Sequence, residues 1–324
     1  MRTFTWIAAA TTAVVLIAAG GAAAAGTVGT TFPIGFPTIV DASLGTPVIG
    51  FGAAGPVRHT PVIFLHGNND TPYPTACNPF YGAIHSLAQA LADNGYSPSE
   101  LWGLGYQGDQ CDLLADQTKR SGVAHTTVAN IPDLDRFVHA VLDYTGAKRV
   151  DIVGHSLGVT LARAWMKTDH TGHLVRRLVA IDGPNHGIIS CSPDPLNYWQ
   201  LPANGGFTPD SPLCQEYGSA DSVFLSWLNR GQETPGPTDY LVIRNVGPDF
   251  VYSPLADGFL PGVPAEDSLG RPHDFSDSAA LEGAQEIDLT GQGAYDPLLG
   301  TAHLGILASP ATAAAALAFL TQDK

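Results

Sequence analysis

Short apolar runs alternate with segments of helical periodicity from residue 61 onward, and this alternation is the feature that most narrows the folds open to the chain. The apolar runs have strand length and lie at 62–65, 101–104, 150–153, 178–181 and 240–243, and a further strand is expected at 286–289, where apolar and acidic residues alternate. The segments between them repeat apolar residues at helical spacing at 81–94, 132–146 and 157–167, and a last helix is expected from Ser309 and Pro310. Strands alternating with helices predict an α/β fold with a mostly parallel sheet covered on both faces.

Composition narrows the class of protein further. The 324 residues are 44% apolar and only 14% charged, which suits a packed core and argues against a disordered chain. Asp and Glu number 30 against 15 Lys and Arg, giving a net charge of −15. Nucleic acids and anionic lipids need clustered basic residues, so neither is expected as a partner. We find no linker or repeat and expect one domain.

The first 25 residues have the pattern of an export signal. Arg2 precedes an apolar stretch at 6–21, and four alanines follow at 22–25. We expect cleavage near Ala25, a secreted mature chain of residues 26–324, and no stable membrane insertion. The competing interpretation is an uncleaved anchor, since about 20 apolar residues can span a bilayer. The weakly hydrophobic alanines and the lack of a basic stop favour the signal.

Four cysteines form an even set, which in an exported protein predicts two disulfides. Three pairings are open, and proximity in the sequence favours Cys77–Cys111 and Cys191–Cys214. No Cys or His spacing is typical of zinc, so no metal is expected.

Residues 154–158 read GHSLG and fit the pattern G-x-S-x-G, with a strand directly before and a helix directly after. A serine on such a sharp turn is held in a strained backbone, and side chains at Gly154 or Gly158 would clash. The sequence therefore predicts Ser156 as a nucleophile, with His155 completing the turn. The alternative is an ordinary glycine-rich turn.

A serine nucleophile needs a histidine base, and the order nucleophile, acid, base restricts the choice to histidines after Ser156. His303 follows the last strand and precedes the last helix, which makes it the preferred base. His186 also follows a strand and could line the site, and His273 is a weaker alternative. His170 and His173 are expected at the surface.

The remaining groups of such a site are an acid and two oxyanion donors. Asp249 follows an apolar strand and is the preferred acid, with Asp257 as the runner-up. The backbone N–H of Leu157, directly after the nucleophile, is the first expected donor. The second is expected from the turn 65–70, and we place it on Asn68.

Several segments together resemble the secreted α/β-hydrolase lipases of the class 2 group, and the chain is similar to single-domain extracellular poly(3-hydroxybutyrate) depolymerases. They are PVIFLHGNND at 61–70, VDIVGHSLG at 150–158, GIISC at 187–191, Asp249 with Val251, and His303. The resemblance implies the α/β-hydrolase fold and no cofactor, and gives Ser156, Asp249 and His303 the roles of nucleophile, acid and base. Relatives often carry Ala and Met where this chain has Gly154 and Leu157.

A long interruption of the strand–helix pattern, about 183–237, is expected to be a lid-like or substrate-binding insertion. Its aromatic residues could form an apolar groove or simply pack in the core; they are Tyr198, Trp199, Phe207, Tyr217, Phe224 and Trp227. Residues 192–236 contain none of the segments that carry the resemblance, and they are expected to decide the substrate.

These features predict a secreted serine ester hydrolase of the lipase or carboxylesterase type, acting as a monomer on neutral, apolar acyl esters. The substrate could be a small molecule, a lipid or a polyester. A polyester (polyhydroxyalkanoate) depolymerase is the alternative, and an acyltransferase with the same three residues is less favoured. Amide hydrolysis and a non-catalytic binding protein of the same fold stay open as further alternatives.

Overall fold

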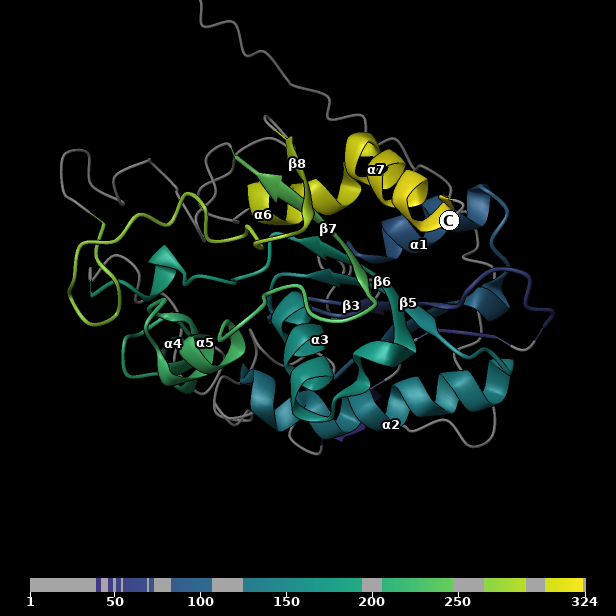
Figure 1. Cartoon of the computed structure of the whole chain (residues 1–324), viewed down its shortest axis with the longest axis horizontal. Coiled ribbons are helices and arrows are strands. Elements are labelled where there is room, and N and C mark those ends of the chain that lie inside the picture. Colours follow the sequence, from purple (N-terminus) through teal and green to yellow (C-terminus); the bar gives the residue numbers. More distant parts are fainter. Residues whose placement is uncertain are drawn as a thin grey trace, which may run out of the picture.

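A six-stranded sheet forms the centre of the molecule (Figure 1). The computed structural model describes residues 39–41, 46–48, 51–53, 55–68, 70–72, 83–106, 125–193, 206–246, 265–289 and 301–322. Within them the sheet has the order β4-β3-β5-β6-β7-β8, and every neighbouring pair is parallel. The strands are β3 (Val62–Leu65), β4 (Leu101–Leu104), β5 (Val150–His155), β6 (Val175–Ile181), β7 (Asp239–Asn245) and β8 (Gln285–Leu289). The predicted α/β fold with a parallel sheet is confirmed.

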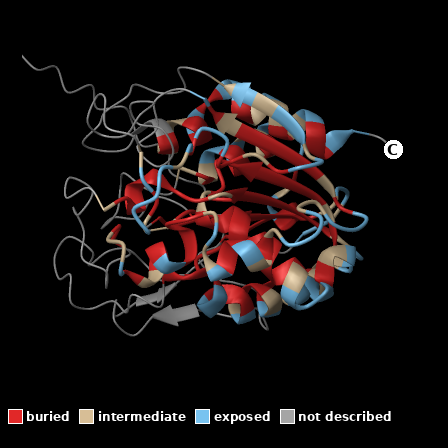
Figure 2. Cartoon of the chain, turned by 60° about the vertical axis from the view of Figure 1, so that its left-hand side comes forward, coloured by how far each residue is buried: buried red, intermediate tan, exposed pale blue. Residues whose placement is uncertain are grey.

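Helices cover both faces of this sheet. On one face α2 (Thr127–Thr145) and α3 (Leu157–Thr168) pack against the strands in one apolar cluster. On the other face α1 (His85–Asp93) and α7 (Pro310–Thr321) pack in a second cluster. Figure 2 shows the result, with the central strands almost entirely buried. Strands buried on both faces explain why they read as continuous apolar runs rather than as alternating ones.

Shorter helices connect these layers. They are η1 (Pro98–Glu100), η4 (Thr171–Leu174), η5 (Ile189–Cys191), α4 (Pro212–Tyr217), α5 (Val223–Leu228), α6 (Thr301–Gly305) and η8 (Ile306–Ala308). The expected start of the last helix is confirmed, because the Ser309 side chain accepts the N–H of Ala311 and Pro310 occupies the first turn. No helix in the part of the chain that the structure describes is long and apolar enough to cross a membrane.

Residues 26 to about 60 are rich in Gly, Pro, Thr and Ala, a composition that predicts loop with one or two edge strands. Two strands are present, β1 (Ile39–Asp41) and β2 (Thr46–Val48), and they pair antiparallel in a small sheet of their own. The connection to the large sheet comes later, where Phe51 bridges to Gly103 of the edge strand β4.

The start of α2 differs from the prediction. The sequence placed it at Pro132, but the helix begins at Thr127 and Pro132 lies inside it. Thr126 precedes the helix without a capping side-chain bond of its own. The cap comes instead from Glu216 of α4, whose carboxylate accepts the N–H of Thr127 at 2.7 Å. An acceptor supplied by another element satisfies the first turn and lets the helix start five residues earlier.

Candidate active site

Ser156 lies on the sharp turn between β5 and α3. Its backbone has φ 52° and ψ −126°, a region that non-glycine residues rarely occupy. Its N–H donates to the carbonyl of Ile181 at 2.9 Å, which fixes the turn to the neighbouring strand β6. Such a strained serine between a buried strand and a helix is the geometry of a nucleophile elbow.

Close approach of backbones requires both glycines of the motif. A Cβ on Gly158 would lie 2.3 Å from the carbonyl oxygen of Leu65 and 2.7 Å from that of His66. A Cβ on Gly154 would lie 2.9 Å from the carbonyl oxygen of Gly158. The contacts with residues 65 and 66 also bring the start of α3 against the end of β3.

The turn after β3 packs directly on the serine. A Cβ on Gly67 would stand 3.0 Å from Ser156 Cβ and 3.5 Å from Ser156 Oγ. Asn68 follows, and its Oδ1 lies 2.9 Å from Nδ1 of His125. Leu157 is the first residue of α3, so its N–H has no acceptor within the helix. The two segments expected to carry the oxyanion donors are therefore neighbours of Ser156.

The side chain of Tyr106 contacts the same turn at His66. Its ring stacks on that of His66, with centroids 4.3 Å apart and planes 3° from parallel, and its hydroxyl donates to the His66 carbonyl. Both side chains are buried. Tyr106 and His125 were not predicted as neighbours of the site, because neither belongs to a motif. The one indication in the sequence is their position, since Tyr106 lies shortly after β4 and His125 directly before α2, near the edge of the sheet.

His303 lies on α6, next to the turn that carries Ser156. Its ring lies 4.5 Å, centroid to centroid, from the ring of His155, the residue before Ser156. Its carbonyl oxygen lies 2.9 Å from His155 Nε2, and its side chain is 6% exposed. Asp249 and Asp257, the preferred acid and its alternative, lie outside the described residues.

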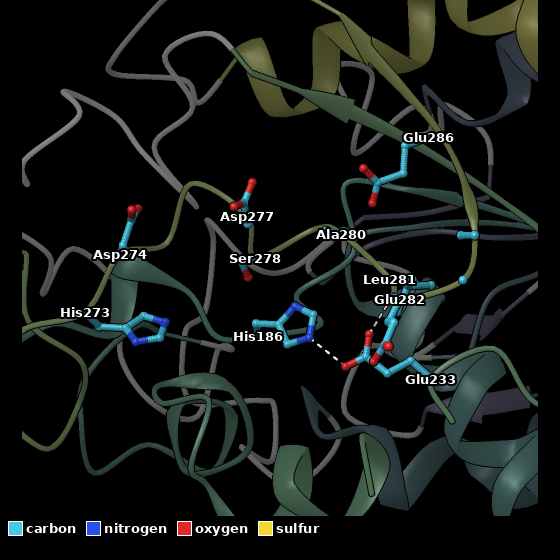
Figure 3. A pocket seen from close by; sticks show the side chains of 12 residues that line it. His186, Glu233, His273, Asp274, Asp277, Ser278, Ala280, Leu281, Glu282 and Glu286 are labelled. Atoms are coloured by element: carbon cyan, nitrogen blue, oxygen red, sulfur yellow. Dashed lines mark hydrogen bonds and ion pairs between the residues drawn. The ribbon is translucent and has the colours of Figure 1, made fainter. Parts of the chain in front are cut away.

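The other histidines lie elsewhere. His186 Nε2 lies 2.8 Å from Glu233 Oε1, and His186 and His273 line one open hollow of about 690 Å³ with acidic residues around it (Figure 3). Neither Ser156 nor His303 is among the described residues that line it. His170 and His173 are exposed, as expected.

Burial sets the charge of His155. Removal from water lowers its pKa well below the ordinary value, and the neighbouring His303 acts in the same direction. His155 is therefore neutral, and because a carbonyl oxygen only accepts, its Nε2 carries the proton. In the described residues no group of three His, Cys, Asp or Glu side chains is arranged to hold a metal.

The segment at about 183–237, which the sequence predicts to be an insertion, is tied to the core. A disulfide joins Cys191 to Cys214 of α4, with Cα atoms 5.5 Å apart; Cys77 and Cys111 lie outside the described residues. Three of its aromatic side chains, Phe207, Tyr217 and Phe224, are buried in the cluster that also holds α2 and α3. They are core residues, so they cannot form the open groove that the sequence allowed.

Among the other aromatic residues of this segment, Tyr198 and Trp199 lie outside the described residues. Trp227 is described and, unlike Phe207, Tyr217 and Phe224, is not fully buried. It is partly buried and lines a hollow of about 680 Å³ between α2, α5 and the end of α3. The other lining residues are Val128, Ile131, Pro132, Asp135, Arg136, Thr168 and Asp169. The ammonium group of Lys167 lies 5.6 Å from the centre of the Trp227 ring.

Comparison with known proteins agrees with this geometry. The sequence model of the family described as lipase (class 2) matches residues 59–253. A mature lipase of Bacillus licheniformis, BlEst2, has a similar structure with a TM-score of 0.51 at 15% identity, covering 84% of this chain and 98% of that one. The phospholipase PlaB of Legionella pneumophila gives a TM-score of 0.50 at 15% identity, covering 82% of this chain and 60% of that one. At these identities the likeness concerns the fold, which is that of the α/β-hydrolases.

Proposed function

Because the chain belongs to the class 2 lipase family and is thus a lipolytic carboxylic ester hydrolase, we propose that it is a secreted serine hydrolase that cleaves neutral, apolar acyl esters through an acyl-enzyme on Ser156. The observation that carries this proposal is the strained Ser156 between β5 and α3, with Gly67 packed on its side chain and His303 beside the preceding residue.

The chemistry follows from these positions. Ser156 Oγ attacks the ester carbonyl carbon while His303 takes the serine proton. The oxyanion accepts hydrogen bonds from the N–H groups of Asn68 and Leu157, and His303 then protonates the leaving alcohol. A water molecule, deprotonated by the same histidine, releases the acid and restores Ser156. Loss of one oxyanion donor costs about 3–4 kcal/mol in such sites.

Asp249 is the proposed acid of the site, which would hold His303 in one tautomer and stabilise its charged form. Its position in the chain supports this role. The strand β7, which pairs with β6, ends at Asn245, and Asp249 follows four residues later. Asp257 is the alternative, further along the same connection.

The scarcity of charged residues, 14% of the chain, supports neutral esters as substrates. One observation favours a second candidate, a polyester depolymerase. The hollow lined by Trp227, Val128 and Ile131 would bind a polyester without a separate binding domain, although its lining also includes the charged Asp135, Arg136 and Asp169.

Export is proposed on the N-terminal pattern and is supported by the disulfide Cys191–Cys214, since such bonds persist outside the cytosol. Residues 1–25 are then the signal and 26–324 one monomeric domain, with about 183–237 inserted.

The test is a substrate panel with the purified mature protein and its Ser156→Ala variant. The panel holds p-nitrophenyl esters of rising chain length, emulsified triglyceride and a polyhydroxyalkanoate film. Hydrolysis that the substitution abolishes without lowering the melting temperature supports the proposal, and near-normal turnover by Ser156→Ala overturns it. Clearing of the film without triglyceride hydrolysis favours the depolymerase.

Paired variants assign the other roles. His303→Ala should be as severe as Ser156→Ala, whereas His273→Ala should keep full activity; the reverse result would move the base to His273. Asp249→Asn and Asp257→Asn decide the acid in the same way, since only the true acid lowers kcat by orders of magnitude.

A further inference from the structure

The side chain of His155 joins three parts of the site. His155 directly precedes Ser156 in the chain, its ring lies 4.5 Å from that of His303, and its Nε2 lies 2.9 Å from the His303 carbonyl oxygen. On the opposite side of the ring, a Cβ on Gly67 would stand 3.2 Å from its Nδ1. One buried ring thus separates the helix that carries His303 from the turn that carries Asn68.

The direction of the hydrogen bond is fixed by its acceptor. A carbonyl oxygen cannot donate, so Nε2–H of His155 donates to residue 303 and Nδ1 keeps its lone pair. Nδ1 has no hydrogen-bond partner among the described residues. Among the described residues, the one hydrogen bond of this ring is therefore the bond to the backbone of His303.

Contacts with other elements have to set the place of His303. It lies in α6, which has only five residues, and a helix this short gains little stability from its own hydrogen bonds. Proton transfer between Ser156 and a base requires the two groups to be placed to better than about 1 Å. A misplacement of about 1 Å can lower the rate about 100-fold.

We propose that His155 is a positioning residue of the ester hydrolase. Its Nε2–H holds the His303 backbone at a fixed position relative to Ser156. The inference rests on the proposed roles of Ser156 and His303. It assigns a function to a residue that the motif G-x-S-x-G leaves unspecified, and it gives no chemical step to His155 itself.

Two polar variants separate this role from simple core packing. The amide nitrogen of Gln can reach the place of a histidine Nε2, whereas that of Asn reaches only the place of Nδ1. His155→Gln can therefore still donate to the His303 carbonyl, and His155→Asn cannot. His155→Phe keeps the ring and removes the donor.

The experiment measures kcat and KM on a soluble p-nitrophenyl ester, with active serine counted by a p-nitrophenyl phosphonate and folding followed by the melting temperature. His155→Phe and His155→Asn should lower kcat per active serine by about 10- to 100-fold with KM changed less than about twofold. His155→Gln should recover most of that loss. His139→Gln, on an exposed histidine of α2, is the control and should match the wild type.

Equal activity of the Gln and Asn variants, or a wild-type kcat in His155→Phe, would overturn the inference. If His155→Phe does not fold, the comparison of Gln with Asn decides alone. Failure of the proposed function is seen separately, because Ser156→Ala would then stay active whatever the His155 variants do.

Discussion

The carboxylate of Glu216 accepts the backbone N–H of Thr127 at 2.7 Å, so that a short helix of the inserted segment caps a core helix. Thr127 is the first residue of α2, where N–H groups lack acceptors within the helix. Burial raises the pKa of Glu216 to about 7, although hydrogen bonds from Thr127 and Val128 act in the opposite direction. The folded protein therefore keeps a proton on this group at a pH where the unfolded chain has lost it.

We predict that Glu216 lowers the stability of the protein as pH rises from about 4.5 to about 7. Across this window the folded state binds more protons than the unfolded state, so the free energy of unfolding falls with pH and levels off above 7. The shift corresponds to about 3 kcal/mol. Urea unfolding of the wild type and Glu216→Gln at several pH values measures it.

Gln is the suitable replacement because its amide oxygen still accepts the N–H of Thr127 but cannot ionise. The difference in unfolding free energy between the two proteins should change by about 3 kcal/mol across the window. Unfolding curves that run parallel at every pH would show that Glu216 does not titrate as its burial implies. Glu282→Gln, on an exposed residue, controls for the loss of one charge.

Gly67→Ala should damage catalysis more than stability. The added Cβ would stand 3.0 Å from Ser156 Cβ, so the turn after β3, proposed to carry an oxyanion donor, must move away from Ser156. We expect kcat to fall at least tenfold, toward the 100-fold or more seen when an oxyanion donor is lost. Steady-state kinetics on a soluble ester, together with the melting temperature, measure both effects.

Gly146→Ala is the matched control. Gly146 ends α2 at φ +69°, and a Cβ there would meet nothing within 4 Å. Alanine is strained in this conformation by about 1 kcal/mol, so the melting temperature should fall while kcat stays unchanged. If kcat fell in both variants in proportion to the fall in melting temperature, the loss in Gly67→Ala would be an effect of stability and not of the contact with Ser156.

The sequence predicts well those features that neighbouring residues determine. Five of the six strands contain a short apolar run, whereas β8 reads QEIDL and is largely exposed. The turn at Ser156 is specified by two glycines within two residues of it, so this turn and the five runs follow from local pattern. The place of His303 beside this turn follows from topology, because the loops after parallel strands meet at one edge of the sheet.

Long-range contacts explain what the sequence does not reveal. The early start of α2 depends on Glu216, which is 89 positions away from Thr127. Phe224 and Trp227 lie one helical turn apart on α5, yet the former is buried in the core and the latter lines a surface hollow. No local sequence pattern distinguishes the buried side chain from the partly exposed one, because tertiary packing decides which of the two is covered.

Removing the disulfide should destabilise the protein by about 3 kcal/mol. The bond joins residues 23 positions apart, and closing a loop of this size restricts the unfolded chain by roughly that free energy. Urea unfolding of the Cys191→Ala, Cys214→Ala double variant under oxidising conditions measures the loss. An unfolding free energy equal to that of the wild type would show that the buried core alone holds α4 in place.

The contact between His125 Nδ1 and Asn68 Oδ1, at 2.9 Å, predicts a coupled pair beside the oxyanion turn. Asn68→Ala leaves the backbone N–H in place, so its expected effect is a moderate one, about three- to tenfold in kcat, through a looser turn. His125→Ala removes the same hydrogen bond from the other side and should cost a similar factor.

A double-mutant cycle on kcat/KM tests this coupling. If both single variants break one shared contact, the double variant should be little worse than either, with a coupling free energy of about 1 kcal/mol. His139→Ala in place of His125→Ala is the control, since His139 lies on the exposed side of α2 and should combine additively with Asn68→Ala. Additive losses in the His125 cycle would mean that the hydrogen bond does not position the turn, and that each side chain acts through separate neighbours.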